Sequence, residues 1–251
     1  MSGVVLYSES DTAGSNIAKI LERDYGIASI AYEKRIPYMK LEDLSFIRDS
    51  LLEGDVCIVA SRHRSESGTP SLTVHSPGNY GIAGAGGSDR ELGFAPALYL
   101  RKALKSLQDG RLEGFEVCLE ATHHGPTALR HPMMFVEVGS TEKEWGDLAA
   151  CRKAALAAKS LFEEDVEEMP VAIGLGGGHY CRKFSAVSDY ALGHICAKHA
   201  LSCLDEPMLS QMIEKTVPHP AFALVEKKGL GKEKARVLDL LKGSGLEIVY
   251  V

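Results

Sequence analysis

The sequence lacks the closely spaced cysteine pairs that are typical of small metal and redox sites. It contains six cysteines, and no two of them form a CxxC motif. Cys57 and Cys118 lie inside apolar runs, where cysteine behaves as a small hydrophobic residue. Neither a disulfide scaffold nor a zinc ribbon is therefore indicated.

A long hydrophobic run is also missing. No segment approaches the roughly 20 apolar residues that a membrane-spanning helix needs. The opening residues MSGVVLYSESD lack the basic and extended apolar regions of a signal peptide. We therefore expect a cytoplasmic protein with no membrane partner.

The chain also lacks an overall positive charge. The chain has 28 lysines and arginines against 34 aspartates and glutamates, a formal charge of −6. Non-specific affinity for nucleic acid depends on cationic side chains that displace counterions, so we expect no binding to DNA. Local basic clusters are present nevertheless: Arg62 and Arg64 flank His63, Arg182 and Lys183 follow His179, and further lysines crowd 227–236. The clusters beside histidines favour an anionic ligand at that place.

The chain alternates apolar strand patterns with amphipathic helix patterns. We expect strands over 4–8, 28–32, 55–59, 71–75, 115–121, 133–140, 171–175, 221–226 and 246–251. We expect helices over 11–21, 41–54, 92–107, 141–163, 189–201, 207–215 and 232–241, with Asp11 as an N-cap, a Thr141/Glu144 capping box, and Gly54 and Gly243 as C-terminal stops. This order predicts one domain over 1–251 with an α/β fold, a three-layer α/β/α sandwich. Short links between strands predict a mixed sheet.

Three of the predicted strands run through a short loop into histidine. They end at His63, at His123 and His124, and at His179. Ligands of α/β proteins collect beyond the carboxyl ends of parallel strands, so we expect these imidazoles to meet at one edge of the sheet. The sequence therefore predicts an enzyme with one histidine-rich site.

The densest motif is EATHHGPT, residues 120–127. In an extended chain, adjacent histidines point in opposite directions, so we expect one of His123 and His124 to reach a ligand while the other orients or packs. With Glu120 at the same strand end, they are candidates for a zinc ligand with its orienting partner or for a general base with its activator.

A glycine run precedes His179. Gly176, Gly177 and Gly178 allow backbone amides to approach a ligand closely, either a phosphate or a developing oxyanion. The spacing matches neither the P-loop nor the dinucleotide fingerprint.

Two more histidine segments and a buried acid complete the candidates. His63 and His75 bracket a short loop, and Glu137 lies in an apolar strand, where an unpaired carboxylate is costly. We expect Glu137 to pair with a site histidine. We interpret His131, His194, His199 and His219 as structural or solvent-facing residues on helix faces or beside prolines.

Several long motifs, in this order, resemble one known family. They are SRHRSESGTPSLTVHSPGN, ELGFAPAL, EATHHGPT, FVEVGSTEKEW, GLGGGHY, FSAVSDYALGHI and KKGL. The chain resembles the archaeal and plant D-aminoacyl-tRNA deacylases over nearly its whole length. One departure is Cys181-Arg182, where Ala-Pro usually follows the glycine motif.

The resemblance implies hydrolysis of the ester between a D-amino acid and the 3′-terminal adenosine of tRNA, with broad side-chain tolerance and zinc dependence. It also implies a fold similar to phosphorylase and peptidyl-tRNA hydrolase proteins. The expected partner is the acceptor end of D-aminoacyl-tRNA, and we expect a monomer.

We assign the candidate residues to three roles. Catalysis is assigned to Glu120, His123, His124 and His179. Substrate binding is assigned to Arg62, Arg64, Gly176, Gly177, Gly178, Tyr180, Arg182 and Lys183. Zn²⁺ binding is assigned to His63, His75, His123, Glu137 and His179.

Three alternatives stay open at this point. A zinc-dependent peptidase or amidohydrolase would use the same chemistry without a tRNA surface. A non-catalytic tRNA- or nucleotide-binding module would keep the basic clusters and tolerate loss of the histidines. A metal-free deacylase would rely on the substrate hydroxyl and backbone amides.

Overall fold

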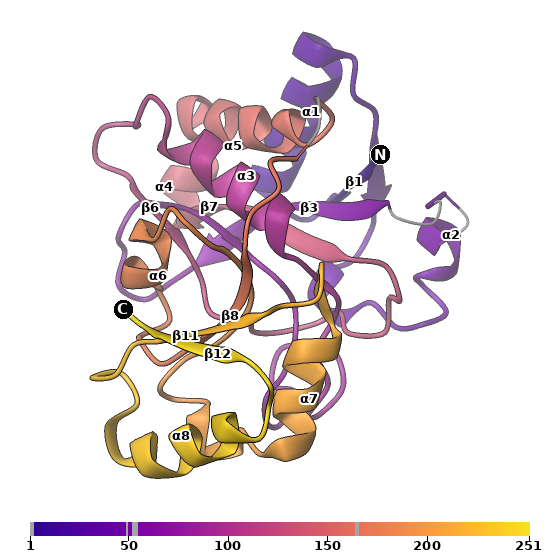
Figure 1. Ribbon diagram of the computed structural model, residues 1–251. Coiled ribbons are helices and arrows are strands. Elements are labelled where there is room, and N and C mark those ends of the chain that lie inside the picture. Colours follow the sequence, from indigo (N-terminus) through magenta and orange to yellow (C-terminus); the bar gives the residue numbers. More distant parts are fainter. Residues whose placement is uncertain (1–2, 49, 52–54, 164–165) are drawn as a thin grey trace.

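The computed structural model describes residues 3–48, 50–51, 55–163 and 166–251. Twelve strands in the described ranges form two main sheets and one short pair (Figure 1). None of the helices in these ranges is long and apolar enough to cross a membrane.

The larger sheet has six strands and mixed direction. Its spatial order is β2 (Ser29–Tyr32), β1 (Gly3–Ser8), β3 (Val56–Arg64), β7 (Met133–Ser140), β4 (Ser71–His75) and β6 (Glu116–Leu119). The first four strands are parallel, whereas β4 runs antiparallel to β7 and β6 is parallel to β4. The predicted mixed sheet is confirmed.

Helical segments cover both faces of this sheet. On one face lie α1 (Thr12–Tyr25), α3 (Ala97–Gln108) and α5 (Leu148–Ser160) (Figure 1). On the other lie η1 (Ile36–Tyr38) and α2 (Ser45–Arg48). Strand β3 shows the alternation: Ile58 packs in the cluster under α1 and α5, and Val59 in the cluster under η1 and α2. The predicted α/β/α layering is therefore confirmed.

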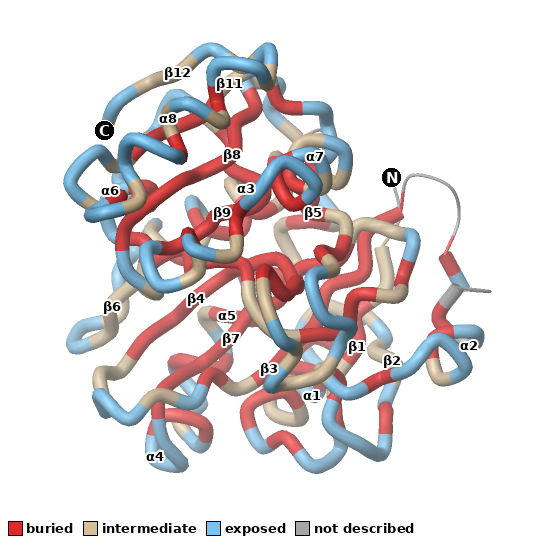
Figure 2. The backbone as a smooth tube through the Cα atoms, turned by 90° about the horizontal axis from the view of Figure 1, so that it is seen from below, coloured by how far each residue is buried: buried red, intermediate tan, exposed pale blue. Residues whose placement is uncertain are grey.

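A second sheet, which the sequence did not predict, forms a further layer. It consists of β12 (Glu247–Tyr250), β11 (Phe222–Val225), β8 (Val171–Leu175) and β9 (Ala191–Cys196), all parallel. One face packs on α7 (Glu206–Glu214) and α8 (Lys234–Lys242), and the other meets α3 and α6 (Arg182–Ala186). The tube in Figure 2 shows that β8 is buried along its length, as it must be between two helical layers.

The remaining elements are short. They are β5 (Ala95–Pro96) paired with β10 (Thr216–Val217), the 3₁₀ turns η2 (Leu201–Cys203) and η3 (Gly231–Glu233), and α4 (Glu142–Trp145). One hydrophobic cluster includes Val136 of β7 together with Ala172 and Leu224 of the second sheet. The single domain over 1–251 stays a prediction.

One predicted helix is wrong. Residues 189–201 contain strand β9 and a turn instead, and all six residues of β9 are buried. A strand buried on both faces loses the alternation of period two and cannot be told from a buried helix by periodicity.

Other boundaries differ by less. The 141–163 helix is two helices, because Asp147 caps a new start by accepting from Ala149 and Ala150 after Gly146. The 92–107 helix begins only at Ala97. The 41–54 helix is seen as α2 over 45–48, and its predicted end at Gly54 lies outside the described residues. The Asp11 cap, the Thr141/Glu144 box and the Gly243 stop are confirmed.

Candidate active site

The centre of the site is a carboxylate on the middle strand of three. Glu137 of β7 lies level with Ser61 of β3 and Thr73 of β4. Two residues further along their own strands come His63 and His75, on the same sheet face. Because β3 and β4 run in opposite directions, these histidines approach Glu137 from opposite sides, with nitrogens 3.5 Å and 3.6 Å from its Oε2.

His75 joins the histidines that were expected to meet at one edge, but it lies level with Phe135 of β7, whereas His63 lies level with Gly139. The site lies on a face of the sheet, because the antiparallel strand β4 carries His75 back towards the start of β7, beside Phe135. The expected pairing of Glu137 with a site histidine is confirmed.

Glu120 joins the site from the end of β6. Its backbone amide continues the β4–β6 pairing by donating to the Val74 carbonyl at 3.0 Å. Its carboxylate is fully buried and touches three imidazoles: Oε1 lies 3.1 Å from His63, and Oε2 lies 2.8 Å from His179 and 3.6 Å from His123. The sequence thus correctly grouped Glu120 with His63 of β3 and with His123 and His179, which follow β6 and β8.

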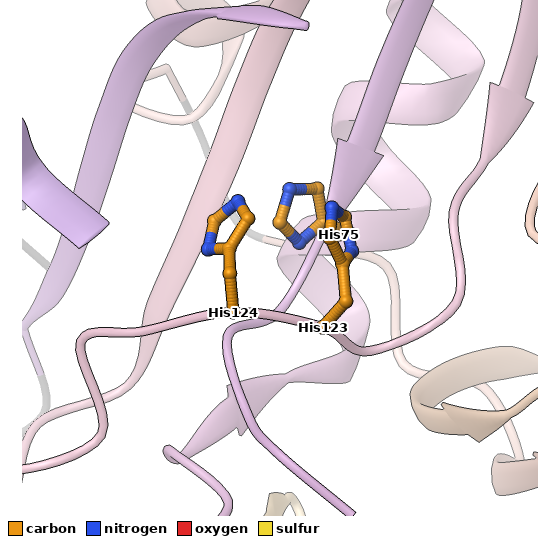
Figure 3. Close-up of side chains that lie close together, drawn as sticks. All are labelled: His75, His123 and His124. Carbon is orange, nitrogen blue, oxygen red and sulfur yellow. The ribbon is translucent and has the colours of Figure 1, made fainter. Parts of the chain in front are cut away.

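His123 and His124 both face His75, contrary to the expected opposite directions. His124 has φ +47°, which breaks the extended geometry that makes neighbouring side chains alternate. The ring centroids of His123 and His124 lie 4.2 Å and 4.8 Å from that of His75 (Figure 3).

These three imidazoles share one arrangement. Each Nδ1 faces a backbone carbonyl, which can only accept: His75 donates to Ser76 (3.2 Å), His123 to Ala121 (2.8 Å) and His124 to Gly125 (2.7 Å). With Nδ1 protonated, each Nε2 of a neutral ring carries a lone pair. Within the described residues, Nε2 of His75 has no hydrogen-bond partner.

Burial sets the charge of the paired histidines. Burial, reinforced by the nearby His75, lowers the pKa of His124 to about 4 and that of His123 well below its ordinary value. Both rings are therefore neutral at physiological pH. Burial also opposes a charge on His75, but Glu137 outweighs it and raises the His75 pKa.

His63 carries the opposite charge state. Burial disfavours its cation, yet Glu137 and Glu120 outweigh burial and raise the His63 pKa to about 10. Burial also disfavours the ionised form of Glu120, but His179, His63 and His123 outweigh burial and lower the Glu120 pKa to about 2. The cationic His63 also donates from Nε2 to the Tyr180 hydroxyl at 2.8 Å. Glu137, whose pKa its two histidines lower against burial, completes a buried ionic network.

A pocket of about 360 Å³ opens onto this network. It lies at the reversal point of the six-stranded sheet, between the ends of β1 and β3, the usual place for a ligand in such sheets. His63, His123, His124, Glu137 and His179 line it, and it is also bordered by Ser8, Ser10, Asp11, Arg35, Ser61, Arg62 and Arg64.

The predicted substrate-binding residues separate into groups. Arg62 and Arg64 line the pocket, and the Arg62 guanidinium lies 4.9 Å from the centre of the Trp145 ring. Tyr180 holds His63. Arg182 pairs with Glu116 outside the pocket, at 2.5 Å.

The glycine loop faces elsewhere. Gly176 donates its amide to the Cys196 carbonyl, while Gly177 and Gly178 line a second pocket beside the site. Lys183 pairs with Glu226 at 3.6 Å, next to that second pocket.

Sequence reasoning missed Asp11 and Arg35 as pocket residues. Asp11 was expected only as a helix cap, and besides capping Gly14 it accepts from the Arg62 amide at 2.9 Å. No local pattern marks Arg35, since it reaches the pocket only through the fold.

The remaining histidines have structural or surface positions. His194 is fully buried in β9, not on a helix; its Nε2 donates to the Gly93 carbonyl at 3.0 Å, and its Nδ1 faces the Thr122 hydroxyl at 3.1 Å. His199 and His219 are exposed, and His131 is half-buried.

The donor set fits a zinc ion. His75, His123 and His124 place one ligand atom each within 4.8 Å of one another, and so do His63, Glu120 and His179, and His75, Glu120 and Glu137. Neutral imidazoles held through Nδ1 by carbonyls are the usual protein ligands of zinc. Both Glu120 oxygens are buried as well, but they already face His63, His179 and His123 at 3.1, 2.8 and 3.6 Å.

Comparison with known proteins agrees with the motifs. A family model described as D-aminoacyl-tRNA deacylase matches residues 51–249. A D-aminoacyl-tRNA deacylase of Cenarchaeum symbiosum is 40% identical over 248 residues, covering 95% of this chain and 96% of that protein. One of Ignicoccus hospitalis is 39% identical over the full length of both.

A solved structure shows the same fold. The crystal structure of a conserved protein of unknown function superposes with a TM-score of 0.89 at 26% identity, covering 99% of this chain and 95% of the other.

Proposed function

Because this chain belongs to the D-aminoacyl-tRNA deacylase family, we propose that its histidine–glutamate pocket is the place where it hydrolyses the ester between a D-amino acid and the 3′-terminal adenosine of tRNA. The products are free tRNA and the D-amino acid. The observation that carries this assignment is that His63, His123, His124, Glu137 and His179 line one pocket. Behind them the buried Glu120 contacts His63, His123 and His179. Action on tRNA favours a cytoplasmic location.

His179 is the proposed general base. Its Nε2 faces the ionised Glu120, so Nδ1 is the nitrogen left to accept a proton. A water that loses its proton to Nδ1 attacks the ester carbonyl carbon. The C–O bond to the ribose then breaks, and the proton passes from Nδ1 to the 3′ oxygen.

Other side chains position the reactants. Arg35, Arg62 and Arg64 supply cations at the pocket that suit the terminal phosphate of tRNA. Tyr180 and the two glutamates hold His63 in place.

We propose that His75, His123 and His124 bind the zinc ion that the resemblance implies. Zinc bound there would polarise the ester carbonyl and acidify a water molecule. The ionised Glu120 and Glu137 would offset its charge.

The test compares amino-acid release from matched D- and L-aminoacyl-tRNA. We expect release from the D form alone, and no release from the D form would overturn the proposal. Chelation should abolish release and zinc should restore it; full activity without metal would overturn the zinc assignment while leaving the deacylase intact.

A variant pair separates binding from folding. His124→Gln should lose bound zinc, measured by elemental analysis, and about 10²-fold or more in kcat/KM. His219→Gln, at an exposed position, is the matched control and should retain both. Unchanged zinc content in His124→Gln would contradict the ligand assignment.

A further inference from the structure

The second pocket lies at the carboxyl edge of the four-stranded sheet. Its volume is about 920 Å³, and its walls come from three loops, over 177–178, 198–202 and 226–233. These loops follow β8, β9 and β11, respectively. The pocket is therefore formed by the ends of parallel strands.

The strand order marks this place independently. In the order β12-β11-β8-β9, the chain passes from β8 to its neighbour β9 on one side, and from β11 to its neighbour β12 on the other side. The direction in which strands are added to the sheet therefore reverses between β8 and β11. Helix α6 follows β8 on one face, whereas α8 follows β11 on the opposite face. Ligands of doubly wound sheets bind outside the strand ends at this reversal point.

The charge of the pocket is positive. Lys198, Lys228 and Lys232 line it, and none of them forms an ion pair within the described ranges. The two acids of the lining are engaged elsewhere: Glu226 lies 3.6 Å from Lys183, and Glu233 pairs with Arg236 at 2.9 Å.

The lysine loops are packed tightly on the glycine loop. A Cβ on Gly229 would lie 2.2 Å from the Gly177 nitrogen, so only glycine allows this approach. The Lys198 amide donates to the Gly177 carbonyl at 2.9 Å. The backbone of the lysine-bearing loops is thus held against the loop that ends in His179.

This loop separates the two pockets. Gly177 and Gly178 line the second pocket, and the next residue, His179, lines the first. The exposed Gly178 therefore lies between His179, where the ester is proposed to bind, and the lysines of the second pocket.

On the basis of the proposed function, we infer that the second pocket binds backbone phosphates of the tRNA strand whose 3′ end occupies the first. Three unpaired lysines beside an exposed glycine match a phosphate chain rather than a neutral ligand. The pocket contributes affinity for tRNA and takes no part in ester cleavage.

The test uses two substrates that share the ester and the terminal adenosine, of which only the tRNA carries backbone phosphates. Lys198→Gln, Lys228→Gln and Lys232→Gln are combined and assayed on D-aminoacyl-tRNA and on 3′-O-D-aminoacyl-adenosine. We expect kcat/KM for the tRNA substrate to fall about 10- to 100-fold at 0.15 M salt, because each lost phosphate contact to a single strand removes about 0.7 from the slope of log K against log salt. Hydrolysis of the adenosine ester should not change.

Two controls identify the cause. Replacing the same lysines by arginine keeps the charge and should preserve tRNA activity. Lys19, Lys105 and Lys143, exposed on the helices α1, α3 and α4, are changed to glutamine as a charge-matched variant and should have at most a small effect.

Three results would overturn the inference. They are unchanged activity on tRNA, an equal loss on both substrates, and an equal loss in the charge-matched variant. Binding of inorganic phosphate and of adenosine monophosphate is measured in parallel. If the wild type binds the mononucleotide tightly, and the triple variant loses this binding but keeps its affinity for tRNA, the pocket is assigned to a small ligand.

The affinity of the same variants for tRNA without an amino acid distinguishes a failure of this inference from a failure of the proposed function. If the wild-type protein hydrolyses neither ester, the proposed function fails. The phosphate pocket is then judged by tRNA affinity alone: a 10- to 100-fold loss in the triple variant supports it, and no loss overturns it.

Discussion

Each of the two sheets has a pocket at an equivalent place, but side chains of different chemistry line the two pockets. In each sheet the pocket lies where the chain reverses direction, between β1 and β3 or between β8 and β11. The first pocket is lined by buried or half-buried imidazoles and the buried Glu137, with strongly shifted pKa values at His63 and Glu137. The second is lined by exposed lysines. Topology thus determines where a ligand can bind, while the side chains determine which chemistry is possible there.

Glu137→Gln is expected to have the largest effect and would disrupt the first pocket only. The cationic His63 loses one of its two carboxylates, so we expect the free energy of unfolding to fall by about 3 kcal/mol and kcat/KM to fall about 10²-fold or more. Urea denaturation and deacylation kinetics measure the two effects.

Glu116→Gln is the matched control for that prediction. Glu116 forms a surface pair with Arg182, and removing it should cost less than about 1 kcal/mol. Similar losses in the two variants would show that the buried network has no special role.

The next prediction concerns His194, at the junction between the two sheets, and the pH dependence of the free energy of unfolding. Burial lowers its pKa to about 3, below the unfolded value of about 6.5, so the unfolded state binds the proton first. Its contribution is complete above pH 6.5 and is lost as pH falls towards 3, about 2 kcal/mol by pH 5.

The measurement is the free energy of unfolding between pH 7 and pH 5, for the wild type and for His194→Gln. Glutamine keeps one donor and one acceptor, so this variant should lose stability less steeply with falling pH. Parallel pH profiles would refute the prediction.

Tyr180→Phe should have an intermediate effect. It removes the hydroxyl that accepts from His63 at 2.8 Å, and we expect about a 10-fold loss in kcat/KM. Tyr190→Phe is the control, since the Tyr190 ring packs on Phe222 of the second sheet. Equal activity of the two variants would remove Tyr180 from the positioning of His63.

Arg182→Ala should have the smallest effect. The sequence suggested a role in substrate binding, but the guanidinium pairs with Glu116 and lines neither pocket. We expect kcat/KM for D-aminoacyl-tRNA to change by less than about 2-fold. A larger loss would show that the substrate reaches beyond the two pockets.

The sequence correctly predicted the membership of the cluster but not its geometry. Histidines at strand ends identified His63, His123 and His179, and the cost of a buried acid identified Glu137. The direction of His124 depends on a left-handed backbone, and the place of His75 on an antiparallel pairing. Neither feature follows from local spacing.

Features that depend on pairing between distant segments were harder to predict from the sequence than the members of the cluster. Residues 191–196 were assigned to a helix because a strand buried on both faces shows no alternation. The division of the strands into two sheets depends on which neighbours they pair with, and backbone hydrogen bonds between distant segments leave no periodic signal.

By itself, the sequence determined the alternation of strands and helices, the caps at Asp11 and Gly243, the identity of the ionisable groups and, through its motifs, the family. These features depend on neighbouring residues and on composition. Only the tertiary structure decided that the glycine loop separates two pockets, and that His63 is a cation while His124 is neutral. Charge states depend on burial and on the distance to carboxylates from other strands, which exist only once the chain has folded.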